Sequence, residues 1–326
     1  MKKDNTRSLS LSTTIDTTKV NTILGVTILF LYFLMVMGTF VTSTGSGLAC
    51  PDWPLCYGSV TPPLKLSIWF EWGHRLLGGI TGLLIITSTL LVWRHYRGVP
   101  RLLTGIVVGL LLLAVFIGGI TVLSEAPYLD SLIRIAIVSS HLIIATLVLI
   151  SLLFILRRLH GRNLKVAATP ETEALPEERH AGEKGYHFLL FCAVYFQVIL
   201  GILVRYSKAS LACPDFPLCQ GKLIPSFSNY AVALHFSHRI LALTVVLLTT
   251  ILLVRAIQKR SGVETSFITF TLVLLQAVFG ILIVLTGMFL PLIIMHGATG
   301  FLLLGWLAYQ AAPFLFRNIV WKRGAL

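Results

Sequence analysis

Five of the nine histidines lie inside long apolar segments, where an ionisable side chain is expected to serve a function. His74 and His141 lie at similar distances from the ends of their segments, as do His238 and His296. Each pair could face inward at one level of a helix bundle, where two opposed imidazoles commonly bind haem iron. The alternatives are histidines that only hydrogen-bond between helices, or a copper or other metal centre, for which thioether and carboxylate partners are lacking at that level.

Glu71 is the one acidic residue placed inside an apolar segment, and it precedes His74 by three positions on the same helix face. A carboxyl group there could hold or pass a proton beside a bound group. The alternative is an ion pair with Arg75 or a hydrogen bond to a neighbouring helix. The matching position before His238 is His235, for which we expect a supporting role beside the ligand. We therefore expect the chemistry in the N-terminal half.

Two segments of the chain repeat each other. Leu48–Cys56 and Leu211–Cys219 differ only where Trp53 is replaced by Phe216, and a His-Arg pair follows each of them. Four apolar segments precede a polar stretch and four follow it, so the sequence predicts a duplication. Because each half has an even number of spans, the halves should be related by an axis along the membrane normal.

The repeated segments each contain two cysteines separated by prolines that restrict the backbone. We expect two structural disulfides, Cys50–Cys56 and Cys213–Cys219, in loops outside the cytoplasm. A redox-active pair or a transient metal site is the alternative, although the spacing lacks the Cys-x2-Cys form of a zinc site.

The elements that carry these residues are predicted to be membrane-spanning helices. Hydrophobic residues make up 56% of the 326 residues and charged residues 12%, which is too apolar for a soluble domain. The fold class expected is an all-α integral membrane protein of two tandem four-helix bundles. Apolar runs of spanning length fall at residues 20–42, 67–93, 102–123, 132–156, 186–205, 230–254, 265–287 and 290–316.

The expected domains follow from these spans. They are an N-terminal tail (1–19), the first four-helix half (20–156), a flexible linker (157–185), the second half (186–316) and a C-terminal tail (317–326).

The formal net charge of +13 results from 26 Lys and Arg against 13 Asp and Glu. The basic residues gather in the tails and in alternate connections, which by the positive-inside rule places both termini in the cytoplasm. No basic patch is interleaved with stacking aromatic residues, so nucleic-acid binding is not expected. Haem carries propionates, and four arginines near the histidines are candidates to bind them, with snorkelling to the interface as the alternative: Arg75, Arg239, Arg134 and Arg205.

In these residues the chain resembles the haem A synthase family, of the bacterial type with cysteine pairs in both halves. The resemblance covers nearly the whole chain and rests on four groups of residues: Thr42–Gly47, Cys50–Cys56, Glu71–Arg75, and Arg205–Cys219 with His238-Arg239.

The resemblance implies an enzyme of the bacterial cell membrane that oxidises the C8 methyl group of haem O to a formyl group, giving haem A for cytochrome oxidase. It implies a haem b cofactor between His238 and His296, substrate haem O at His74 and His141, and Glu71 as the catalytic carboxylate. The implied partners are the lipid bilayer, an electron donor and a transiently docking haem O synthase. Self-association is compatible with this function.

Two other classes of protein share some of these features. A di-haem b-type electron carrier would also use paired histidines but would not need Glu71. A transporter with parallel repeats would be expected to have broken helices and polar residues near the membrane midplane.

Overall fold

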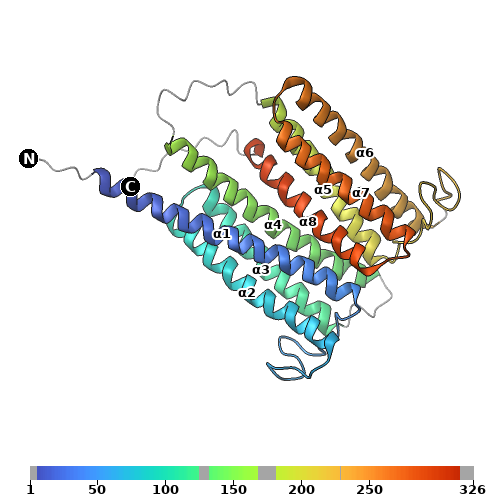
Figure 1. The fold of residues 1–326 in the computed structure, drawn as a ribbon. Coiled ribbons are helices and arrows are strands. Elements are labelled where there is room, and N and C mark those ends of the chain that lie inside the picture. The colour runs from blue at the N-terminus through green and yellow to red at the C-terminus, as the bar shows by residue number, and fades with distance from the viewer. Residues whose placement is uncertain (1–5, 125–131, 168–180, 228, 316–326) are drawn as a thin grey trace, which may run out of the picture.

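The computed structural model describes residues 6–124, 132–167, 181–227 and 229–315. These residues form eight helices joined by loops (Figure 1). In chain order the helices are α1 (Thr6–Ser43), α2 (Leu66–His95), α3 (Val99–Leu123), α4 (Leu132–Ala167), α5 (Ala181–Tyr206), α6 (Tyr230–Lys259), α7 (Val263–Leu285) and α8 (Leu290–Leu315).

All eight of these helices are long and apolar enough to cross a membrane. The prediction of an all-α protein with eight spans, made from the lengths of the apolar runs, is therefore confirmed.

Three helices extend beyond the apolar runs that predict them. Helix α1 already begins at Thr6, α4 continues to Ala167, and α5 begins at Ala181. The apolar run limits the part that lipid can surround, but the helical backbone hydrogen bonds continue into the polar residues beyond it. Much of the expected linker 157–185 is thus helical. Its middle, residues 168–180, lies outside the described residues, as does the predicted tail 317–326.

The contacts between helices divide them into two groups of four, which lie side by side in Figure 1. In the first group α1 contacts α2, α2 contacts α3, α3 contacts α4, and α4 contacts α1. The second group repeats this ring with α5 to α8, and α4 and α8 form the main contact between the groups. These contacts agree with two tandem bundles, while the symmetry axis that relates them stays a prediction.

Several of the largest fully buried side chains belong to α4 and α8, which form the main contact between the two groups. Leu152 and Ile155 of α4 and Leu304 and Leu307 of α8 are completely buried. Gly305 allows the close approach of these helices, since a Cβ atom there would lie 3.3 Å from Cδ1 of Leu153. Large apolar side chains on the outer faces of the helices are exposed, as expected where lipid is the solvent.

The loops that follow α1 and α5 lie at the same end of the molecule, here called the loop end (Figure 1). Each loop contains one disulfide, Cys50–Cys56 in the first and Cys213–Cys219 in the second. Both predicted cysteine pairs are therefore confirmed.

Candidate functional site

Each of the four paired histidines packs against a glycine of the preceding helix. A Cβ atom at Gly38 in α1 would lie 3.1 Å from Cε1 of His74 in α2, and one at Gly118 in α3 would lie 3.1 Å from Cε1 of His141 in α4. The second half repeats this contact, with Gly201 opposite His238 at 3.1 Å and Gly280 opposite His296 at 3.4 Å. At Gly38, Gly118 and Gly201 a side chain would crowd the imidazole, whereas the distance at Gly280 is that of an ordinary van der Waals contact.

The four imidazoles lie in the same layer of the molecule. Each histidine is within about three turns of the loop end of its helix. His74 and His141 belong to α2 and α4, which lie opposite each other in the first ring, and His238 and His296 belong to α6 and α8, which lie opposite each other in the second. Each half thus has two histidines at one level on opposite helices.

The ring nitrogens of these histidines suit axial haem ligation. Nδ1 of His141 donates to the carbonyl oxygen of Ala114 at 3.0 Å, which leaves Nε2 as the nitrogen with a free lone pair. Nδ1 of His74, His238 and His296 is buried and has no hydrogen-bond partner among the described residues. Buried imidazole nitrogens without partners are costly. A metal satisfies only the ring nitrogen that it binds, so these three rings would either bind iron through Nδ1 or keep an unpaired Nδ1 when Nε2 binds it.

No further metal-ligating side chains join the two histidine pairs among the described residues. Among the described residues, no group of three or more His, Cys, Asp or Glu is arranged to hold a metal ion. Haem needs only two protein ligands, because the porphyrin supplies the other four. The residues present therefore fit haem in both halves.

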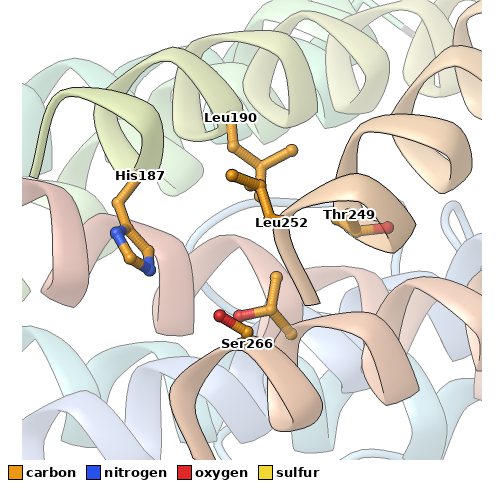
Figure 2. A pocket seen from close by; sticks show the side chains of 6 residues that line it. His187, Leu190, Thr249, Leu252 and Ser266 are labelled. Atoms are coloured by element: carbon orange, nitrogen blue, oxygen red, sulfur yellow. The ribbon is translucent and has the colours of Figure 1, made fainter. Parts of the chain in front are cut away.

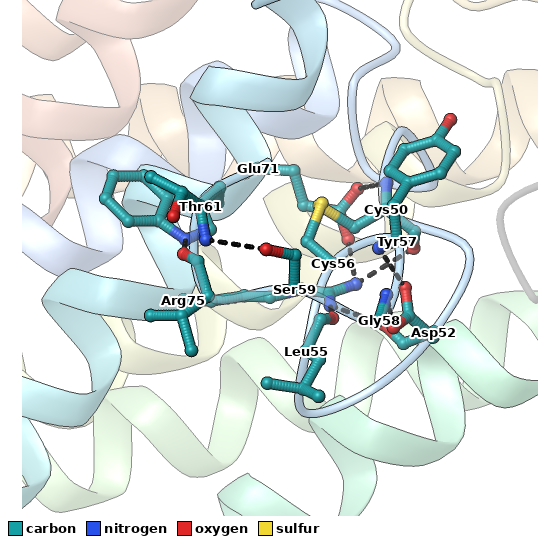
Figure 3. The surroundings of a disulfide bond; sticks show 12 residues. Cys50, Asp52, Leu55, Cys56, Tyr57, Gly58, Ser59, Thr61, Glu71 and Arg75 are labelled. Carbon is teal, nitrogen blue, oxygen red and sulfur yellow. Dashed lines mark hydrogen bonds and ion pairs between the residues drawn. A yellow bond between two sulfur atoms is a disulfide. The ribbon is translucent and has the colours of Figure 1, made fainter. Parts of the chain in front are cut away.

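Glu71 joins α2 to the first disulfide loop (Figure 3). Its side chain is 3% exposed, and its Oε2 accepts a hydrogen bond of 2.8 Å from the backbone N–H of Cys50. Its Oε1 forms an ion pair of 2.6 Å with Nη2 of Arg75. The ion pair weighed as an alternative role for Glu71 is present, together with a loop contact.

His235 occupies the position of Glu71 in the second half. Its Nδ1 lies 3.3 Å from the backbone nitrogen of Cys213, and its Nε2 lies 3.3 Å from Nε of Arg239. A neutral imidazole can accept at only one of its nitrogens. The loop is therefore held in the same way in both halves, but more weakly by the imidazole than by the carboxylate.

Arg75 and Arg239 bind the loops through backbone carbonyl oxygens. Arg75 donates to the carbonyls of Cys50, Asp52 and Leu55. Arg239 donates to the equivalent carbonyls of Cys213, Asp215 and Leu218. Both guanidinium groups thus fix the loops, and their predicted contact with haem propionates stays a prediction.

The other two arginines connect the halves. Nη2 of Arg134 in α4 donates to the carbonyl of Tyr206 at 2.8 Å, and Nη2 of Arg205 in α5 donates to Oγ of Ser43 at 2.8 Å. Both contacts lie near the loop end, so these arginines stabilise the interface between the two histidine pairs. Their role as propionate ligands likewise stays a prediction.

An aspartate closes each disulfide loop. The carboxylate of Asp52 accepts from the backbone N–H groups of Tyr57 and Gly58, and that of Asp215 accepts from Gln220 and Gly221. The hydrogen bond from Gly58 is the main reason that the pKa of Asp52 lies below its ordinary value, and the bond from Gly221 acts in the same way on the pKa of Asp215.

Three residues of this region did not emerge as candidates from the sequence. Gln197 in α5 and Gln276 in α7 donate to the backbone carbonyls of His238 and His296, and Gly38 packs against His74. The sequence does contain a feature that points to the two glutamines: each is a polar residue in an otherwise apolar helix, one turn before the glycine that contacts a histidine.

A small pocket lies farther from the loop end, between α5, α6 and α7 (Figure 2). Thr249 in its lining follows His238 in α6 by about three turns. The pocket is therefore separate from the histidine layer. It is lined by His187, Leu190, Thr249, Leu252, Ser266 and Thr269.

Comparison with known proteins identifies the family of this chain. Residues 21–68 and 64–308 match the family model COX15-CtaA, described as cytochrome oxidase assembly protein. A protein of Halalkalibacterium halodurans named heme A synthase is 31% identical over 273 residues, which cover 81% of this chain and 86% of the relative. Proteins with the same name from Shouchella clausii and Bacillus cereus are 31% and 30% identical, over 80% and 83% of this chain and 85% of each relative. The chain belongs to the COX15-CtaA family of cytochrome oxidase assembly proteins.

Proposed function

We propose that this protein is a haem A synthase that oxidises the C8 methyl group of haem O to a formyl group. The observation that carries the proposal is a difference between two otherwise matching sites. Both halves bring two histidines together beneath a disulfide loop, but only the first half has a carboxylate, Glu71, one turn before a ligand candidate. The curated relatives named heme A synthase support the same activity.

In this proposal the substrate haem O is held in the N-terminal half by His74 and His141. The haem b cofactor is held in the C-terminal half by His238 and His296, where it supplies a redox centre that passes electrons singly. The arginines that connect the halves, Arg134 and Arg205, keep the two sites at a fixed separation.

Glu71 has the chemistry that the oxidation needs from the protein. If water supplies the oxygen, converting CH3 to CHO releases four protons and four electrons. The electrons would leave through the haem b site, and a carboxylate can accept the protons at Oε1 or Oε2. Arg75 fixes Oε1, and the N–H of Cys50 fixes Oε2, so the group is held in one orientation. His235 in the other half has no carboxylate oxygen to offer, which suits a half that only holds its cofactor.

The proposed setting is the bacterial cell membrane, with both termini in the cytoplasm. The even number of described spans returns the end of α8 to the side where α1 begins, opposite the loop end (Figure 1). Disulfides persist outside the cytoplasm, and the excess of basic residues in the tails favours the same orientation.

The test is to express the protein with and without a haem O synthase, purify it, and identify its extracted pigments by mass. Haem b should be present in both samples, and haem A only where haem O is made. Haem b with unaltered haem O in the sample that contains the haem O synthase would instead indicate a di-haem electron carrier.

A further inference from the structure

The two halves differ in how they hold the backbone of their paired histidines. In the C-terminal half Nε2 of Gln197 donates to the carbonyl oxygen of His238 at 2.9 Å, and Nε2 of Gln276 donates to that of His296 at 2.7 Å. The corresponding residues of the N-terminal half, one turn before Gly38 and Gly118, are Leu34 and Ala114. Neither of these has a polar side-chain atom that could make such a bond.

The orientation of both side-chain amides is fixed by their partners. A backbone carbonyl only accepts, so the NH2 group of each glutamine must face it. Nε2 of Gln197 also lies 3.3 Å from Nε2 of His238, and its Oε1 is buried without a partner among the described residues. Burying an unpaired amide oxygen costs free energy, so Gln197 is not explained by stability alone.

Gln276 is held equally closely. It donates to Oγ1 of Thr299 as well as to His296, and Gly300 leaves room for it, since a Cβ atom there would lie 3.3 Å from its Nε2. Each histidine of the C-terminal half is therefore fixed from the same neighbouring helix by two contacts. One is the glycine against its ring and the other is the glutamine on its carbonyl.

A ligand that is already fixed loses less conformational freedom when it binds, which strengthens binding. We propose that Gln197 and Gln276 are positioning residues that make the C-terminal half the site of a permanently retained haem. Leu34 and Ala114 offer no such bond to the backbone carbonyls of His74 and His141, although Nδ1 of His141 donates to the carbonyl of Ala114. The backbone of the N-terminal pair is therefore held less tightly, so that substrate can enter and product can leave. This inference rests on the proposed division into a cofactor half and a substrate half.

The test exchanges these residues between the halves in the full-length holoprotein. Gln197→Leu and Gln276→Ala install the residues of the N-terminal half, and the exposed Gln258 of α6 provides the control Gln258→Leu. The measurement is the rate at which haem b leaves the purified protein for excess apomyoglobin. We expect about tenfold faster loss in the double variant, as is usual when residues that orient a metal ligand are removed, and no change in the control.

A second readout separates positioning from general loosening. The low-spin electron paramagnetic resonance signal of the haem b reports the orientation of its two imidazoles, and it should shift in both single variants. If the double variant does not fold, the reciprocal Leu34→Gln/Ala114→Gln variant decides, because it retains both glutamines and should release its N-terminal haem more slowly. Unchanged release rates and signals would overturn the inference.

The outcome can be told apart from a failure of the proposed function. A protein that forms haem A but keeps haem b equally well without the glutamines refutes only this inference. A protein that forms no haem A, yet loses haem b when the glutamines are replaced, refutes the synthase and leaves the glutamines as residues that retain haem.

Discussion

Glu71 in α2 and His235 in α6 occupy the same place in the two halves, each facing the backbone N–H of the first cysteine of a disulfide loop. The duplicated fold thus uses one position to hold the loop in both halves and varies only the group that holds it. A histidine at this position is compatible with a closed loop. Closing the loop therefore does not require a carboxylate, and the carboxylate of Glu71 is free to serve another role.

This relationship gives the first prediction. Glu71→Ala removes the acceptor for Cys50 and the ion pair with Arg75, and it should cost about 1–3 kcal/mol because the N–H group is left unsatisfied. Glu71→His should retain most of the loop contact. The rate at which a phosphine reduces Cys50–Cys56 should rise in the order wild type, Glu71→His, Glu71→Ala, while Cys213–Cys219 serves as the internal control. Equal rates in all three proteins would show that Glu71 does not stabilise the first disulfide loop.

The second prediction concerns the glycines. Gly38→Ala, Gly118→Ala and Gly201→Ala each place a Cβ atom 3.1 Å from an imidazole, and the resulting overpacking should cost about 1–3 kcal/mol. Haem content should fall in the half concerned. Gly25→Ala in α1 is the matched control, because nothing lies within 4 Å of its Cβ position. Thermal unfolding and pigment content measure both effects, and a loss in the control as large as in the others would argue against a specific contact.

The third prediction assigns the halves. His238→Ala and His296→Ala should each lower the retained haem b, because a haem with one remaining axial ligand is held less firmly. His74→Ala and His141→Ala should leave haem b in place and impair the use of haem O. Absorption spectra and extracted pigments distinguish the two outcomes, and the reverse pattern would mean that cofactor and substrate are exchanged between the halves.

The fourth prediction concerns acid. Because folding lowers the pKa of Asp52 and Asp215 below the ordinary 3.8, the ionised carboxylates stabilise the loops above that value, and the stabilisation is lost only as pH falls through the lowered pKa. Phosphine reduction of the disulfides, normalised to an unstructured peptide, should therefore stay constant from pH 7 to about 4 and rise below it. Asp52→Asn should accelerate reduction of the first disulfide already at pH 7. An increase in the wild type between pH 7 and 5 would contradict this assignment.

The sequence was sufficient to predict the spans and the two disulfides. A run of apolar residues long enough to cross the bilayer is visible without knowing what it packs against. The repeat of Leu48–Cys56 at Leu211–Cys219 likewise shows that each loop is a unit with its own cysteine pair. Both features are local in the chain, and both appear in the structure.

Contacts between distant segments could not be predicted in the same way. The hydrogen bonds from Arg75 and Arg239 to carbonyl oxygens of the disulfide loops arise because the loops fold back over α2 and α6. The hydrogen bonds of Gln197 and Gln276 can be recognised only once α5 is placed beside α6 and α7 beside α8. Such contacts depend on loop conformation and helix rotation, which residue spacing alone does not determine.

The central claim is that the carboxylate of Glu71 serves the oxidation of haem O in the N-terminal half. The most direct measurement is the pigment content of wild type and Glu71→His, each purified from cells that make haem O. We expect haem A and haem b in the wild type, and haem O and haem b in Glu71→His, with haem A reduced by about 10²–10⁴-fold. Haem A at the wild-type level in Glu71→His would contradict it, since an imidazole would then do all that the carboxylate does.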